Sequence, residues 1–314
     1  MLRAVIHAGL HKTGTTSFQR NCNNASSELL KAGIYYPKSR APHHNHFANL
    51  PDTNWISMFA RKTKKLMRDG CLLISAENFE YRFHQDYPEK VERALHQSGI
   101  KHISWVLCFR NPFSSYCSLY SQLSDPERNT KNTYPILEFA ASGRLAAAKG
   151  FLDFQNQSLQ QRFYFNYPSL VKSLRNRLKG QVLGIDFDHF TKNSNIPGDL
   201  LIRSISNDGR NLSDCIKQAR RHNNISPSKE EIEHNYLRRF HSKKGTNLPA
   251  WFDRAVQDRL KSRIAQEPKI EALFQQSFSD WTDCLSSPDD FSKQLEKAKL
   301  LEPPLHLVQK DMTV

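Results

Sequence analysis

Apolar runs that are long enough to cross a sheet, but too short for buried helices, constrain the fold of this chain most. "RAVIHA" occupies residues 3–8, "CLLISAE" residues 71–77 and "HISWVLCFR" residues 102–110. The runs are apolar at successive positions, which is typical of parallel strands that helices cover on both faces. Helical candidates at 87–98 and 112–124 stand next to these runs and provide such helices.

The remaining elements continue the alternation of strands and helices. A helix from about Thr15 through Ala32 is expected to stop at Gly33, before a short strand that Pro37 ends. A further helix is expected at about 136–147. "YPSLVKSLRNRL" then precedes "GQVLGIDFDHF", which contains the last strand. We therefore predict an α/β, P-loop-like fold of three layers with a central parallel sheet.

Strand-like runs cease near residue 190, where the chain becomes charged and helical. "KEEIEHNYLRRF" and "AWFDRAVQDRLKSRI" are the clearest helical pieces of this second half. We predict a core over residues 1–190 and a helical C-terminal region, residues 191–314, packed on that core. No internal repeat and no low-complexity linker separates the two.

Composition bounds the partners and the compartment. The formal net charge is +14, which favours an anionic partner. No zinc-finger spacing or basic-region heptad is present, so we expect no nucleic-acid binding. No apolar run approaches the roughly 20 residues of a membrane span. We expect at most peripheral membrane contact and, because the N-terminus lacks a secretory pattern, a cytoplasmic protein. The six cysteines have no CxxC or ligand spacing and are expected to be reduced thiols.

The segment "HKTGTTS", residues 11–17, follows the first strand directly and opens a helix. Such a turn gathers backbone N–H groups and the positive end of the helix dipole at one point, which suits a phosphate. Gly14 allows close approach of the backbone to the anion. Lys12 precedes the glycine, whereas a kinase-type loop has its lysine after the last glycine. The residues expected to bind the phosphate group are Lys12, Thr13, Gly14, Thr15, Thr16 and Ser17.

A second segment, "CFRNPFSSYCSLYSQ" at 108–122, follows another strand. Together with "HKTGTTS" it resembles the two cofactor motifs of sulfotransferases that use 3′-phosphoadenosine-5′-phosphosulfate (PAPS). In that family a strand-end arginine is followed eight residues later by a serine, and here Ser118 stands eight residues after Arg110. The resemblance covers roughly residues 1–190. It implies that Arg110 and Ser118 bind the 3′-phosphate of PAPS, and that the desulfated nucleotide PAP is the product.

The resemblance also implies roles for catalytic residues. Lys12 is expected at the leaving phosphate oxygen, with His11 assisting it at the sulfuryl group. Glu77 is expected to be the general base, because it ends a strand on the same edge of the sheet as the Lys12 loop. Glu80 is a weaker competitor for that role. Relatives need no metal, so none is expected.

Histidines outside the loop allow several interpretations. His43, His44 and His46 lie together in "APHHNHFANL" and are read as a solvated loop, an acceptor-binding group, an alternative base or, least of all, a metal site. His7 is expected to pack at the end of its strand. The basic stretches at 61–68, 217–222 and 237–244 are read as solvated helix faces.

The sequence therefore predicts a PAPS-dependent sulfotransferase acting on a hydroxyl of a carbohydrate or glycolipid. A P-loop kinase-like phosphotransferase remains an alternative, although it leaves Arg110 and Ser118 without a role. A non-catalytic relative that keeps the nucleotide pocket is a second alternative.

Overall fold

Five parallel strands form one central sheet in the order β2-β3-β1-β4-β5. The strands are β1 (Leu2–His7), β2 (Ile34–Tyr35), β3 (Gly70–Ser75), β4 (His102–Phe109) and β5 (Gln181–Asp186). The predicted α/β fold with a central parallel sheet is confirmed. The computed structural model describes residues 2–38, 41–67, 69–124, 163–191, 196–216, 227–241 and 250–300. The helix predicted at 136–147 lies outside these residues.

Helices follow the strands closely in the predicted order. Those before the last strand are α1 (Thr15–Asn24), α2 (Ser26–Lys31), α3 (Asn45–Ala48), α4 (Asn54–Leu66), the 3₁₀ helix η1 (Glu77–Arg82), α5 (Tyr87–Gln97), α6 (Pro112–Ser124) and α9 (Tyr167–Arg177). The single helix predicted from Thr15 to Ala32 is wrong in one respect, because Ala25 separates α1 from α2. Asparagine and serine residues surround that break, and their side chains compete with the helix backbone for hydrogen bonds.

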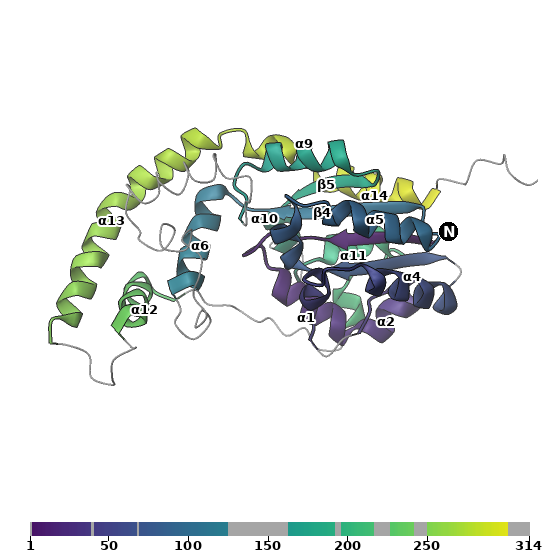
Figure 1. Cartoon of the computed structure of the whole chain (residues 1–314), viewed down its shortest axis with the longest axis horizontal. Helices are drawn as coiled ribbons and strands as arrows, with labels where there is room; N and C mark the ends of the chain where they lie inside the picture. The colour runs from purple at the N-terminus through teal and green to yellow at the C-terminus, as the bar shows by residue number, and fades with distance from the viewer. Residues whose placement is uncertain are drawn as a thin grey trace, which may run out of the picture.

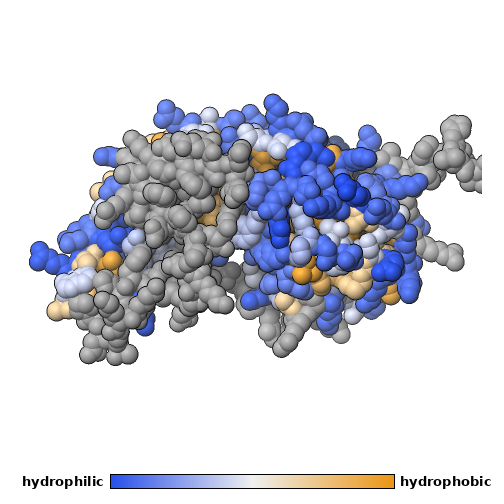
Figure 2. Space-filling model, viewed as in Figure 1, coloured by the Kyte–Doolittle hydropathy of each residue, from blue (hydrophilic) through white to orange (hydrophobic). Residues whose placement is uncertain are grey.

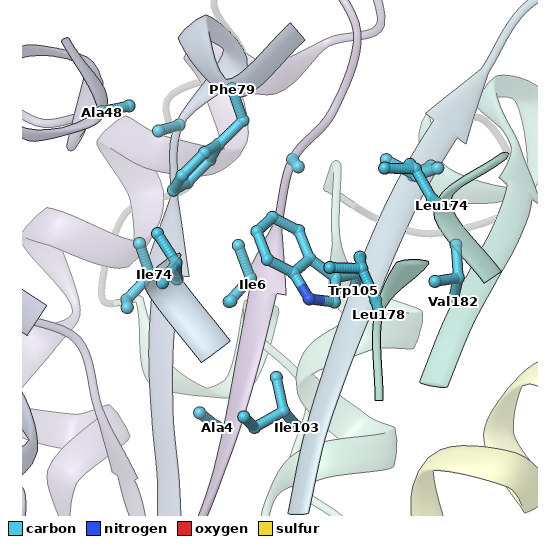
Figure 3. Packing of buried hydrophobic residues seen from close by; sticks show 14 of the residues in the cluster. Ala4, Ile6, Ala48, Ile74, Phe79, Ile103, Trp105, Leu174, Leu178 and Val182 are labelled. Atoms are coloured by element: carbon cyan, nitrogen blue, oxygen red, sulfur yellow. The ribbon is translucent and has the colours of Figure 1, made fainter. Parts of the chain in front are cut away.

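One face of the sheet is covered by α4, α5 and α9. Ile6, Ile74 and Trp105 project from three strands into this layer (Figure 3). Leu174 of α9 and Phe79 of η1 belong to the same buried cluster. The Trp105 ring meets Phe79 edge to face, with 5.4 Å between ring centroids. Every second residue of each apolar run faces this layer, and its burial there explains why it is apolar.

The opposite face takes the alternate residues of the same strands. Val5, Leu73 and Val106 pack there against α1 and α2. Two helices that follow residue 190 also belong to this core, α11 (Asp199–Ile205) and α14 (Pro288–Leu300), through side chains such as Ile202 and Phe291. The continuous apolar runs are explained, because both faces of the sheet are buried. The division of the chain at residue 190 stays a prediction.

Three helices lie beyond the sheet on the side opposite the N-terminus (Figure 1). They are α6, α12 (Lys229–His241) and the long α13 (Phe252–Ser277), and each contacts the other two. Glu233 of α12 is 1% exposed and accepts hydrogen bonds from Tyr120 of α6 and from Arg259 Nε of α13 at 2.8 Å. Arg263 Nη1 lies 3.4 Å from the same carboxylate. A buried carboxylate with these partners ties the three helices together, since removing one partner would leave an uncompensated buried charge.

All six cysteines carry free thiols, as the spacing predicted, and only Cys117 is not fully buried. Along the described ranges, no helix combines the length and the apolar composition needed to cross a membrane. In the view of Figure 2 the coloured surface is mostly hydrophilic, with small hydrophobic groups scattered between polar residues.

Candidate active site

The loop between β1 and α1 adopts a conformation that directs peptide groups to one point. Lys12 has a φ of 69°, the one positive φ outside glycine that the described residues show, and Gly14 at the start of α1 has a φ of 74°. No side chain caps the first turn of α1. The N–H groups of such a turn carry the positive end of the helix dipole, so an anion fits there. Thr16 and Ser17 stand in this first turn, half-buried.

Hydrogen bonds within the protein hold the loop in this shape. The N–H of Ala8 donates to the carbonyl of Val106 on β4 at 3.0 Å. The buried hydroxyl of Thr13 donates to the carbonyl of Leu10 at 2.5 Å. The Thr13 side chain therefore braces the turn.

Glu77 lies directly beside the loop, as its place at the end of β3 predicts. Its Oε2 accepts a hydrogen bond from Thr15 Oγ1 at 2.8 Å, and its Oε1 accepts one from Asn45 Nδ2 at 3.2 Å. The side chain is half-buried. Thr15 thus turns its hydroxyl towards the carboxylate, and the structure brings together two residues that sequence analysis placed at one site. Asn45 was missed, because its contact with Glu77 bridges two elements far apart in the chain.

Glu80 has a different environment from Glu77. It is 2% exposed, and its Oε2 accepts from the backbone N–H of His11 at 2.8 Å and lies 2.6 Å from His11 Nδ1. Its Oε1 accepts from the N–H of Tyr164 at 3.1 Å. These bonds use both carboxylate oxygens to fix the entry of the loop. The position of Glu80 therefore suits a support for the loop better than a base.

His11 is held at both ring nitrogens. Nδ1 faces Glu80 and Nε2 lies 2.8 Å from the hydroxyl of Tyr81. Burial by itself would lower the pKa of His11, but the hydrogen bond and charge of Glu80, aided by the charge of Glu77, outweigh burial and raise it. The imidazolium is thus favoured next to Lys12, with its ring engaged by the protein.

Arg110 and Ser118 form the pair that their spacing predicts. Arg110 follows β4. Its Nη1 donates a hydrogen bond to Oγ of Ser118, which lies in α6, at 2.6 Å. Asn111 caps α6 by accepting from the N–H of Ser114 at 3.1 Å. A half-buried guanidinium with a hydroxyl at its side can grip a phosphate through several hydrogen bonds.

Phe187 stands between the two predicted binding motifs and was missed by sequence analysis. It opens α10 (Phe187–Thr191) directly after β5. The Arg110 guanidinium lies over its ring, 5.0 Å from the centroid. A methyl group placed on Gly14 would lie 3.3 Å from Phe187 Cε2 and 2.8 Å from Thr191 Cγ2. The Gly14 loop and Arg110 thus share one aromatic neighbour. An aromatic residue at the carboxyl end of the last predicted strand was the available signal.

The histidines near the loop are structural. His7 is fully buried between the rings of Phe18 and Phe190, and its Nδ1 lies 2.8 Å from Ser75 Oγ. His44 accepts from the N–H of Ser75 at 3.0 Å and its Nε2 lies 2.8 Å from the carbonyl of Pro37. The interpretation of this cluster as a solvated loop is wrong for His44, because its ring bridges two strand ends in the core.

The other two members of the cluster lie in different surroundings. His46 of α3 packs against Phe47 with the rings tilted and 3.7 Å between their centroids, while His43 precedes the helix. Across the ranges that the structure describes, no three histidine, cysteine or acidic side chains come together in a way that could hold a metal ion. Of the basic stretches, 217–222 and 242–244 lie outside the described residues.

His7 and His44 are expected to take up protons from the solvent when the chain unfolds below neutral pH. Burial lowers the pKa of His7 to about 3 and that of His44 to about 4. The stability that these neutral rings contribute is present above the unfolded pKa of about 6.5 and is lost as pH falls towards the folded values. Near pH 5 each ring should steepen the pH dependence of the unfolding free energy by about 1.4 kcal/mol per pH unit.

Denaturant titrations between about pH 5 and 6 measure this slope. His7→Gln should reduce the slope by the contribution of one proton, about 1.4 kcal/mol per pH unit, relative to the parent chain. Gln97, exposed at the end of α5, provides the control, since its replacement by alanine changes no titrating group and should leave the slope unchanged. An unchanged slope in the His7 variant would contradict the buried neutral ring.

Comparisons with known proteins add little to this geometry. No protein-family model matches the chain, and no curated protein matches it in sequence. Among solved structures, a sulfotransferase from Alicyclobacillus acidocaldarius is similar over 79% of this chain and 98% of its own, with 17% identity and a TM-score of 0.37. That degree of similarity supports no functional statement, so the geometry of the site has to carry the proposal.

Proposed function

We propose that this chain is a PAPS-dependent sulfotransferase that transfers a sulfuryl group to an acceptor hydroxyl and releases PAP. One observation carries the proposal. The Gly14 loop and the Arg110–Ser118 pair leave adjacent strands, β1 and β4, and both border Phe187. A nucleotide with phosphate groups at two separate positions fits two such anion sites placed side by side.

The topology of the sheet supports this reading. From β1 the chain goes on to β2 on one side of the sheet, and from β4 it goes on to β5 on the other side. The crevice at such a switch point, outside the carboxyl ends of the strands, is where open α/β sheets bind ligands. A kinase-like phosphotransferase would use one anion site with a lysine after the glycine, and would leave Arg110 and Ser118 unused.

The residues present fit PAPS. When bound, PAPS supplies a sulfuryl group on a phosphate leaving group. Lys12, at the entry to the loop, would neutralise charge that develops on the leaving oxygen. Arg110 and Ser118 would hold the 3′-phosphate. Glycine is required at position 14, because a side chain there would meet Thr191 and Phe187, which pack against the loop.

Glu77 would take the proton of the acceptor hydroxyl. Thr15 and Asn45 hold the carboxylate in one orientation beside the loop. Each carboxylate oxygen retains a further lone pair when it accepts a single hydrogen bond, so a substrate hydroxyl can still be bound. A base fixed in this way is positioned for proton transfer to occur as the acceptor oxygen attacks.

We further propose that the acceptor is a carbohydrate or a glycolipid, and that no metal takes part. A glutamate base that follows a strand in this way resembles the catalytic glutamate of sulfotransferases that act on glycans. The net charge of +14 also favours anionic partners, among which PAPS itself is one. Transfer of radiolabelled sulfate from PAPS to an extract of glycans and glycolipids tests the activity directly. If the extract were labelled by phosphate from radiolabelled ATP and not by sulfate from PAPS, the proposed sulfotransferase activity would be contradicted.

Arg110→Ala is expected to weaken PAP binding by about 10- to 100-fold, since a charge-assisted contact of this kind contributes about 1.5–3 kcal/mol. Titration calorimetry with PAP measures the loss. Adenosine 5′-phosphate, which lacks the 3′-phosphate, should bind the variant and the parent equally. Arg93→Ala, at an exposed position on α5, is the matched control. Equal loss of affinity for both nucleotides would place Arg110 away from the 3′-phosphate.

A further inference from the structure

A pocket opens between the N-terminus of α6 and the C-terminal end of α13. Its volume is about 260 Å³, and four aromatic rings line it. Phe274 and Phe278 are buried, whereas Phe113 and Trp281 are half-buried. The two half-buried rings give the pocket flat apolar walls that a ligand can reach.

The remaining lining is polar but uncharged. Gln275 and Ser279 are exposed on the rim, and Asn111 stands at the entrance to α6. Among the described side chains that line the pocket, none is acidic or basic. An anionic ligand would find no cation here, and a plain hydrocarbon would leave the amide and hydroxyl groups unmatched. Aromatic walls with a few amide and hydroxyl groups suit a ligand that has both apolar faces and hydroxyl groups.

We infer that this pocket binds an uncharged sugar residue of an oligosaccharide acceptor. The C–H faces of the sugar would pack on Trp281 and Phe113, and its hydroxyls would meet Gln275 and Ser279. The inference rests on the proposed function for the meaning of "acceptor". It adds a site and a substrate class that the loop and the Arg110 pair do not define.

The pocket lies at one side of an aromatic cluster whose other side meets the loop. Phe165 belongs to this cluster, with ring centroids 5.7 Å from Phe274 and 6.2 Å from Phe278. Phe163, in the same cluster, contacts the His11 ring at 5.4 Å. A sugar in the pocket is therefore separated from Glu77 and Lys12 by this cluster. The acceptor has to extend from one place to the other, so it is an oligomer and not a single sugar.

Binding can be tested without PAPS by tryptophan fluorescence. The probes are three neutral trisaccharides, cellotriose, maltotriose and triacetylchitotriose. At least one should change the emission in a saturable way. Trp281→Ala, measured by calorimetry because the variant lacks the reporting tryptophan, should weaken that binding about tenfold, as expected for one aromatic contact and its buried area. Trp251→Ala is the matched control, because Trp251 is 49% exposed at the start of α13 and does not line the pocket.

A second variant separates binding from folding. Trp281 also packs on Tyr167, so its loss could disturb the fold. Ser279→Trp leaves that contact in place and fills the pocket from an exposed position. It should abolish the binding seen by calorimetry while the melting temperature stays unchanged. Binding that survives in both variants would overturn the inference, as would saturable binding of none of the three sugars.

Two further measurements define the ligand class and its link to catalysis. 1-Decanol is the apolar probe. If 1-decanol bound, if Trp281→Ala weakened its binding, and if none of the sugars bound, the ligand would be an alkyl chain and the inference would be overturned. The trisaccharide that binds also defines two acceptors for turnover with PAPS, its pentasaccharide and its monosaccharide. Trp281→Ala should raise the KM for the pentasaccharide about tenfold and leave the KM for the monosaccharide unchanged. Sugar binding without any sulfate transfer would leave the pocket standing and refute the proposed function.

Discussion

Replacing Lys12 by alanine is expected to lower the rate of sulfate transfer by about 10²–10³-fold, with PAP affinity within about threefold of the parent chain. Lys12 stands at the entry of the loop, before the peptide groups of the turn and of α1 that would hold the phosphate. Its charge is needed chiefly when the leaving oxygen becomes negative. Interactions that strengthen only in the transition state change kcat more than binding. Single-turnover kinetics and PAP calorimetry measure the two effects separately.

The backbone at Lys12 requires a second variant as control. Its φ of 69° is unfavourable for alanine, so Lys12→Ala also disturbs the loop. Lys12→Gly adopts a positive φ at no steric cost and still removes the charge. Both variants should lose turnover alike. If the glycine variant kept full turnover, the charge would have no catalytic role, and if Lys12→Ala chiefly lost PAP affinity, the division of labour with Arg110 would be reversed.

Glu77→Gln is expected to reduce turnover by about 10²–10⁴-fold, the usual contribution of a general base, while PAP binding stays unchanged. The amide keeps the size of the carboxylate and one acceptor oxygen, but it cannot take a proton from the acceptor hydroxyl. Single-turnover kinetics at saturating PAPS measure the chemical step, and calorimetry with PAP measures binding.

Asn45→Ala provides the control for altered hydrogen bonding at Glu77. It removes the 3.2 Å bond to Oε1 and leaves the carboxylate and its bond from Thr15 in place. Most of the activity should remain. If the Glu77→Gln variant transferred sulfate at the parental rate, Glu77 would not be the general base, and another group near the loop would have to take the proton.

Several parts of the site were predictable because the signal is local. The eight-residue interval between Arg110 and Ser118 puts both on one side of the strand end and the following helix, and the hydrogen bond at 2.6 Å matches it. Glu77 follows a buried parallel strand, and the carboxyl ends of parallel strands meet at one edge of the sheet. Its contact with Thr15 agrees with that argument.

Other parts depend on contacts between distant segments. Phe187 follows β5, Asn45 opens α3, and Tyr164 precedes α9, yet all three meet residues at the ends of other strands. His44 shows the same limit. A histidine-rich polar segment is typical of an exposed loop. The His44 ring is nevertheless buried, where it bonds with the N–H of Ser75 and the carbonyl of Pro37.

The pattern of the chain alone determined the layers of the molecule and the order of its elements. Apolar residues at successive positions can be buried only when both faces of a sheet are covered, and that requirement holds whatever the partners are. The chain alone also determined which strand ends carry the Gly14 loop and the arginine. Tertiary structure decided which acid is available, because Glu77 and Glu80 stand three residues apart in one 3₁₀ helix. Only packing places Glu80 under His11 and Tyr164 and leaves Glu77 beside the loop.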